Sequence, residues 1–118
     1  MKKALVIEGN DGIRRLLIEV LTQEGYSVDA TANGWQALAR IRTCVPAVVL
    51  LDSKISDMRG IEVLIKISNS YPDLPIILIA HAGEKDVEVS LESGLVKYCM
   101  LKPFSLPDLI ELLNSLEK

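Results

Sequence analysis

The stretch Ala47–Asp52 (AVVLLD) is an unbroken apolar run that ends in a single carboxylate. Two further runs have the same character, Lys3–Ile7 (KALVI) and Ile76–Ala80 (IILIA). Short, β-branched runs of this kind are typical of strands that are buried on both faces, as in a parallel sheet. The segment Tyr26–Ala30 alternates more and is predicted as a strand nearer an edge, and Tyr98–Leu101 is predicted as a fifth strand.

Segments with helical spacing lie between these runs. The apolar residues of Ile13–Leu21 recur on one helix face, with Asp11 or Asn10 as the cap at the start and Gly25 at the end. A similar stripe occupies Leu106–Leu116. The remaining helix candidates are Asn33–Thr43, Gly60–Asn69 and Glu84–Ser93, the last ended by Gly94. Because strand and helix alternate five times, we predict one α/β domain over residues 1–118, with a doubly wound parallel sheet.

Composition excludes several classes of protein. The chain has 118 residues with 13 Lys+Arg and 16 Asp+Glu, a net charge of −3, which argues against nucleic-acid binding through a basic surface. Its 49% hydrophobic residues exclude wholesale disorder. The first apolar run stops at Glu8, too early for a signal peptide, and the longest uncharged stretch within the apolar runs, Thr43–Leu51, is far too short for a membrane span. Neither Cys44 nor Cys99 has a metal-binding spacing, so we expect reduced thiols, a cytoplasmic protein and no membrane partner.

Charged residues follow three of the predicted strands. In an open parallel sheet the functional groups gather outside the carboxyl ends of the strands, so Glu8, Asp52 and Lys102 are expected to meet at one edge. Two carboxylates and one ammonium suggest a site for a divalent cation and an anionic group, with an aspartate able to accept a phosphoryl group. The alternative is that both carboxylates face water and the lysine merely pairs with one of them.

From Lys3 to about Leu116 the chain resembles a response-regulator receiver domain, and most of all the single-domain receivers of phosphorelays. Five segments in order and at family spacing carry this resemblance. They are Gly12–Leu17 (GIRRLL), Ala32–Leu38 (ANGWQAL), Val49–Asp52 (VLLD), Met58–Glu62 (MRGIE) and Lys102–Phe104 (KPF).

The resemblance implies a flavodoxin-like (βα)5 fold with strand order 2-1-3-4-5. It implies that Asp52 accepts a phosphoryl group from a histidine kinase or a phosphotransfer protein, and that Lys102 contacts this group. Magnesium would be held by Glu8, Asp52 and the main-chain carbonyl of Lys54. The peptide bond before Pro103 would be cis. Phosphorylation would change the surface formed by the fourth helix, the fifth strand and the fifth helix, which binds a downstream protein partner.

The sequence departs from the family at the end of the first strand. The family has two adjacent acids there, whereas this chain has Glu8 and Gly9. Asp11 lies nearby, but we expect it to cap the following helix. With one carboxylate fewer, the affinity for Mg²⁺ is expected to be lower.

Two further departures concern the residues that switch the family between states. Ala80 stands where the family has a serine or threonine hydroxyl, so the usual bond to the phosphoryl group cannot form. His81 follows, either as a contact to an anion through its ring or as a solvent-facing loop residue. The segment from Gly94 to Lys102 is one residue longer than the family pattern. Either a bulge brings Tyr98 to the position of the aromatic switch residue, or Cys99 occupies it as a small buried residue.

Two surface features have alternative interpretations. Trp35, the only tryptophan, lies outside the predicted buried face of its helix, and is either a partner contact or a ring that covers the helix. Val63 and Ile67 are one helical turn apart, and we interpret them as part of a well-buried helix rather than as a patch for a partner.

Two functions remain after these departures. The chain is predicted to be a phosphoacceptor receiver, since it retains both Asp52 and Lys102. The alternative is a degenerate receiver that docks partners without being phosphorylated, which Gly9 and Ala80 favour. An enzyme is not expected, because the sequence after Asp52 lacks the second acid of the Asp-x-Asp motif of aspartyl phosphatases.

Overall fold

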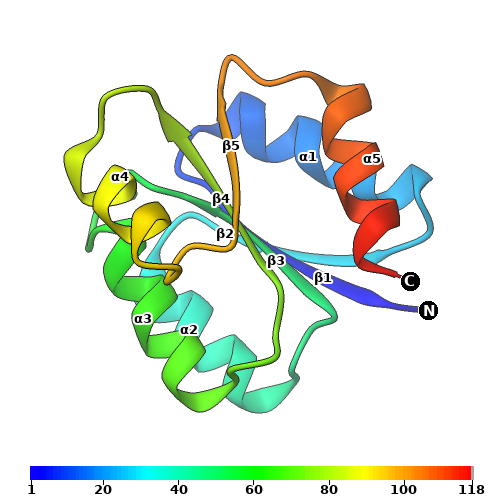
Figure 1. Ribbon diagram of the computed structural model, residues 1–118. Coiled ribbons are helices and arrows are strands. Elements are labelled where there is room, and N and C mark those ends of the chain that lie inside the picture. Colours follow the sequence, from blue (N-terminus) through cyan, green and yellow to red (C-terminus); the bar gives the residue numbers. More distant parts are fainter. Residues whose placement is uncertain (118) are drawn as a thin grey trace.

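The computed structural model describes residues 1–117 and consists of one sheet covered by helices on both faces (Figure 1). Strands and helices alternate along the chain. They are β1 (Lys3–Ile7), α1 (Asp11–Gln23), β2 (Ser27–Thr31), α2 (Gly34–Thr43), β3 (Val48–Asp52), α3 (Gly60–Ser70), β4 (Ile76–His81), α4 (Lys85–Glu92), β5 (Tyr98–Lys102) and α5 (Leu106–Leu116). Nine of these elements match a predicted one to within one residue at either end, and α1 extends two residues beyond the predicted stripe Ile13–Leu21 at each end.

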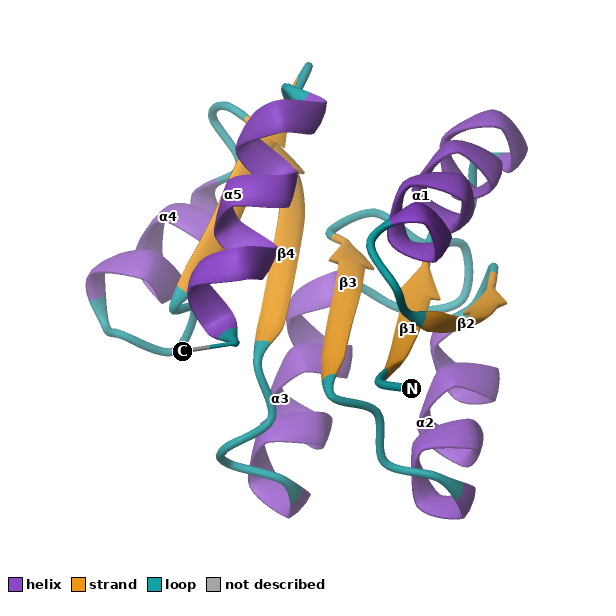
Figure 2. Ribbon diagram, turned by 90° about the vertical axis from the view of Figure 1, so that its right-hand side faces the viewer, coloured by secondary structure: helices purple, strands orange, loops and turns teal. Residues whose placement is uncertain are grey.

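The sheet is parallel and has the strand order β2-β1-β3-β4-β5, which confirms the predicted topology. All five residues of the central strand β3 are buried, whereas β2, at one edge, is only partly buried. The continuous apolar runs therefore arise because both faces of the inner strands are covered. Since the strands point the same way, their carboxyl ends share one edge of the sheet (Figure 2).

Two hydrophobic cores lie on opposite faces of the sheet. Helices α1 and α5 cover one face, where Leu17, Leu21, Leu109 and Leu113 are almost completely buried. Helices α2, α3 and α4 cover the other face. Val63 and Ile67 of α3 are fully buried in this second core, so they do not form a patch for a partner. No helix within residues 1–117 is both long and apolar enough to cross a membrane.

Helix ends follow from local chemistry. The side chain of Asn10 accepts the N–H of Ile13 at 2.9 Å and caps α1, so the expectation that Asp11 is the cap is wrong. The side chain of Asn10, the residue just before the helix, can reach the free N–H groups of the first turn. Asp11 is already inside the helix and pairs with Arg14 instead. Gly25 and Gly94 adopt φ values of +94° and +83° directly after α1 and α4, as predicted for helix-ending glycines.

The pairing of β4 with β5 decides between the two candidates for the switch position. It runs residue by residue from Ile77 opposite Tyr98 to His81 opposite Lys102. The strand therefore has no bulge between Tyr98 and Lys102. Tyr98 packs on the α1–α5 face and Cys99 on the opposite face, because neighbours along a strand alternate. Cys99 therefore lies three residues before Lys102, and no bulge brings Tyr98 to that place.

Close packing fixes the start of α3 against the end of β3. The N–H of Gly60 donates to the carbonyl of Ser53 at 2.8 Å. A Cβ atom at Gly60 would lie 2.6 Å from both the carbonyl oxygen of Asp52 and the Cα of Ser53. Only glycine permits this approach, which brings the first turn of α3 against the backbone of Asp52.

We expect the substitution Gly60→Ala to lower the free energy of unfolding by about 1–3 kcal/mol, because the new methyl group meets rigid backbone. Gly12→Ala, in the first turn of α1, is the control, since its Cβ would meet only the Asn10 side chain at 3.4 Å. This control should leave stability unchanged or raise it by about 0.4–1 kcal/mol. Urea denaturation measures both, and a Gly60→Ala protein as stable as Gly12→Ala would contradict the packing argument.

Candidate functional site

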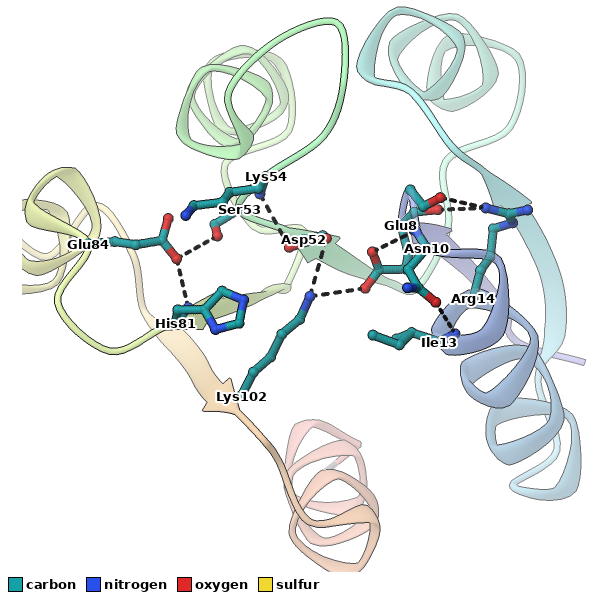
Figure 3. A network of polar contacts seen from close by, with 11 residues as sticks. Glu8, Asn10, Ile13, Arg14, Asp52, Ser53, Lys54, His81, Glu84 and Lys102 are labelled. Carbon is teal, nitrogen blue, oxygen red and sulfur yellow. Dashed lines mark hydrogen bonds and ion pairs between the residues drawn. The ribbon is translucent and has the colours of Figure 1, made fainter.

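The ammonium of Lys102 lies between two carboxylates at the carboxyl edge of the sheet (Figure 3). Its Nζ is 3.3 Å from Oδ2 of Asp52 and 3.5 Å from Oε1 of Glu8. These groups come from the ends of β5, β3 and β1, which confirms the predicted convergence. Glu8 is 1% exposed and Asp52 is 6% exposed, so the alternative of two solvent-facing carboxylates is wrong.

The cluster has two carboxylates and one ammonium, and the effect of this imbalance is seen in the pKa of Glu8. The pKa of Glu8 is raised from its usual 4.5 to about 7, chiefly because the group is buried and secondly because the Asp52 carboxylate lies beside it. The N–H of Asn10, which donates to Oε2 at 3.2 Å, and the ammonium of Lys102 act in the opposite direction. Oε1 of Glu8 is buried and has no hydrogen-bond partner within residues 1–117. A proton or a cation would satisfy this oxygen.

The donor set fits Mg²⁺, which commonly binds one or two carboxylates together with waters and a phosphoryl oxygen. Glu8 and Asp52 each place a hard oxygen atom within 3.5 Å of the Lys102 ammonium, and the Oε1 atom of Glu8 accepts no hydrogen bond within residues 1–117. Residues 1–117 hold no group of three or more acidic, histidine or cysteine side chains suited to a metal. Gly9 is exposed and brings no third carboxylate.

The main chain on both sides of the cluster is fastened by hydrogen bonds. The N–H of Lys54 donates to Oδ1 of Asp52 at 3.2 Å, which places its peptide beside the carboxylate. The guanidinium of Arg14 donates to the carbonyl oxygens of Glu8 at 2.9 Å and of Gly9 at 3.5 Å. It also pairs with Asp11 at 2.6 Å. The sequence analysis did not identify this role of Arg14. The available signal was its three-residue spacing from Asp11, which allows an ion pair on the surface of a helix.

Glu84 forms a second polar network beside the site, and the sequence analysis also missed it. Its Oε2 atom accepts the hydroxyl of Ser53 at 2.9 Å and the main-chain N–H of His81 at 2.7 Å (Figure 3). The N–H of Ser53 donates to the carbonyl of Ile79, which is the last bond between β3 and β4. The N–H of His81 also points toward the side of β3, but β3 has ended there and offers no carbonyl to it. The carboxylate of Glu84 accepts this N–H instead.

The network lies beside Ala80 and His81, the last two residues of β4. Ala80 is completely buried and has no hydroxyl, while His81 is the exposed last residue of β4 rather than part of a loop. His81 takes part through its main chain and not through its ring. The segment between β4 and α4 is therefore joined to the residue that follows Asp52 without any switch hydroxyl.

Asp57 fastens the loop that follows β3. Its carboxylate accepts the N–H groups of Gly34 at 2.9 Å and Trp35 at 3.1 Å, at the start of α2. Although slight desolvation raises the pKa of Asp57, these backbone hydrogen bonds lower it overall. Lys54 lies on the same loop and pairs with Arg59 as an isolated antiparallel bridge.

The raised pKa of Glu8 predicts the pH dependence of folding in metal-free buffer. A carboxyl group with a pKa near 7 in the folded state and near 4.5 when unfolded binds more protons when folded between these values. Its contribution to stability is therefore lost as the pH rises toward 7. Between pH 5.5 and pH 8, the free energy of unfolding of the wild-type protein should fall by about 2 kcal/mol more than that of Glu8→Gln.

Urea denaturation at several pH values in EDTA measures this difference. The control is Glu111→Gln, which removes an exposed carboxylate on α5 and should keep the wild-type profile. Parallel profiles for the wild type and Glu8→Gln would show that Glu8 is not responsible.

Comparison with known proteins places this site in a family. Residues 4–114 match the model of the response regulator receiver domain. The chain is 37% identical over 109 residues to sporulation initiation phosphotransferase F of Bacillus subtilis, covering 92% of this chain and 87% of that protein. It is 26% identical over 118 residues to the chemotaxis protein CheY of Thermotoga maritima, covering 99% and 98%. The transcriptional regulatory protein CreB of Escherichia coli is 35% identical over 101 residues, but the chain spans only 44% of its length.

Solved structures agree with this placement. The response regulator protein TrrA of Thermotoga maritima, solved in complex with Mg²⁺ and BeF, has a TM-score of 0.86 and 31% identity over 98% of this chain and 99% of that one. A CheY-like receiver domain protein of Methanospirillum hungatei has a TM-score of 0.89 and 28% identity over 99% and 94%. The chain therefore belongs to the response regulator receiver domains, the signalling modules of two-component systems.

Proposed function

We propose that this receiver accepts a phosphoryl group on Asp52 from a histidine kinase or a histidine phosphotransfer protein. The observation that carries the proposal is the half-buried Lys102 ammonium at 3.3 Å from the Asp52 carboxylate, at the carboxyl edge of the sheet. A carboxylate oxygen of Asp52 bonds to phosphorus as the phosphorus–nitrogen bond of a phosphohistidine breaks, and the electron pair leaves with the imidazole. Lys102 is then placed to form an ion pair with the new phosphoryl oxygens.

Magnesium would be held by Glu8, Asp52 and the main-chain carbonyl of Lys54. The ion supplies neutralisation of the phosphoryl oxygens during transfer. Glu8 is suited to this task because its Oε1 atom is buried and, within residues 1–117, accepts no hydrogen bond, although it lies 3.5 Å from the Lys102 ammonium. With Gly9 in place of the second acid, the site offers two carboxylates, so we infer weaker binding than in relatives with three.

The phosphorylated protein would signal to a downstream protein through α4, β5 and α5. The exposed apolar side chains of Val89 on α4 and Leu101 on β5 support this choice of surface. The Ser53–Glu84 hydrogen bond supports it too, since it links the residue after Asp52 to the residue before α4. The acidic charge of the chain favours a protein partner over nucleic acid.

The second candidate is a receiver that docks partners without being phosphorylated. The specific observation in its favour is that Glu84 already holds the β4–α4 segment in place, at a site where Ala80 offers no hydroxyl to a phosphoryl group. In that function Glu8, Asp52 and Lys102 would serve as a structural ion cluster.

Intact mass spectrometry after incubation with Mg²⁺ and acetyl phosphate separates the two functions. We expect the wild-type protein to gain the mass of one phosphoryl group and Asp52→Asn to gain none. Asp73→Asn, which changes an exposed aspartate between α3 and β4, should be phosphorylated like the wild type. Absence of an adduct from the wild-type protein, with or without a phosphohistidine donor, would favour the docking function.

The missing acid predicts a gain of function in metal binding. A side chain at Gly9 has room, since a Cβ there would meet only the carbonyl of Ala32 at 4.0 Å. We expect Gly9→Asp to lower the Kd for Mg²⁺ about tenfold, because a third carboxylate joins the site. Calorimetric titration measures this, with Ser27→Asp, at the opposite end of the sheet, as the control for added charge. Equal affinities for both variants would place the metal away from position 9.

A further inference from the structure

A groove lies between helices α2 and α3, which pack side by side on one face of the sheet (Figure 1). It has a volume of about 270 Å³. Ile41 and Ile67 form its buried floor and Leu38 its half-buried wall. Pockets for small molecules commonly measure about 300–1,000 Å³. The groove is therefore better suited to one or two side chains of a protein segment than to a nucleotide or another small molecule.

The charge of this groove is opposite to that of the molecule. Arg42 and Lys66 line it and are exposed, and no acidic residue lines it. The whole chain, in contrast, has a net charge of −3. Within residues 1–117, neither Arg42 nor Lys66 takes part in an ion pair. Two exposed cations on an acidic protein are thus free to bind carboxylates of another molecule.

Trp35 forms an exposed aromatic wall beside these cations. Its side chain is 58% exposed, and the Nζ atom of Lys66 lies 5.7 Å from the centre of its ring. A cation above the ring limits the orientations of both side chains. The backbone of Trp35 is fixed as well, since its N–H donates to Asp57. Tryptophan and arginine held in place at the surface are the residue types that contribute most to protein interfaces.

We propose that the α2–α3 groove is a docking site for an acidic segment of a partner protein that carries one bulky apolar side chain. The apolar side chain lies on Leu38 against the ring of Trp35. Carboxylates on either side of it pair with Arg42 and Lys66. The groove is formed by helix surfaces and includes no residue of the Asp52 cluster, so this docking is independent of the phosphoacceptor function.

Fluorescence titration tests the proposal, because Trp35 is the only tryptophan of the chain. The probe is a nonapeptide with a central leucine and four glutamates on either side. We expect a saturable change in Trp35 emission that weakens with added salt, as required of ion pairs at an exposed site. The same peptide with serine in place of leucine should bind at least about tenfold more weakly, which corresponds to about 1.4 kcal/mol. Equal binding of the two peptides, or no change with either, would overturn the proposal.

A matched pair of charge reversals locates the binding. Lys66→Glu should weaken binding at least about tenfold. Lys97→Glu makes the same charge change in the exposed connection before β5 and should leave the Kd within about twofold. Equal losses in both variants would mean that the peptide responds only to net charge, and would overturn the proposal. Circular dichroism verifies that both variants are folded.

Two further measurements test whether the peptide binds at the Asp52 cluster instead, and whether the groove binds a second copy of the chain. Asp52→Asn should bind the peptide like the wild type, since the groove excludes the phosphoacceptor. Sedimentation of the protein alone should show the same oligomeric state for the wild type and Lys66→Glu. Self-association that Lys66→Glu abolishes would assign the groove to a second copy of the chain and overturn the proposal of an acidic partner.

Discussion

The site depends on one buried ammonium that two buried carboxylates share. Lys102 contacts Asp52 and Glu8, and its side chain is only 14% exposed. Removing a carboxylate from water is costly unless a cation or hydrogen bonds compensate it, and one ammonium cannot fully compensate two. The raised pKa of Glu8 and the lack of a hydrogen bond to its Oε1 atom within residues 1–117 both follow from this deficit of positive charge. One additional positive charge, either a proton or a metal ion, would balance the net charge of the cluster.

Two carboxylates outside the cluster fix the loops around it at the carboxyl edge of the sheet. Asp57 ties the loop after β3 to the start of α2, and Glu84 ties the segment after β4 to Ser53. Both act by accepting N–H or O–H groups that the ends of regular elements leave free. Glu84 fastens the segment that follows Ala80, a residue with no hydroxyl of its own. If Ser53 moved, Glu84 would retain only the N–H of His81, so the start of α4 is sensitive to the position of the residue beside Asp52.

The sequence predicts the fold well because burial on both faces leaves an unmistakable pattern. Runs such as Ile76–Ala80 have no polar alternation, and in a parallel sheet their ends must share an edge, which is enough to bring Glu8, Asp52 and Lys102 together. Contacts that depend on the path of a loop leave no such pattern. Glu84 is 31 residues from Ser53, and Asp57 is 22 from Trp35, so neither partner is apparent from local spacing. The choice of Cys99 over Tyr98 required the pairing of β5 with β4, because a shift of one residue exchanges the two faces of a strand.

The absent acid at position 9 is consistent with the charge balance of the cluster. Three carboxylates beside one ammonium would leave two uncompensated negative charges, whereas Glu8 and Asp52 beside Lys102 leave one. A single excess charge can be removed by one proton at Glu8, whose pKa of about 7 makes this possible near neutral pH. Arg14, bound to the carbonyl oxygens of Glu8 and Gly9, adds positive charge close to the same turn. One proton at Glu8 would therefore balance the charge of the cluster, since Gly9 adds no third carboxylate to it.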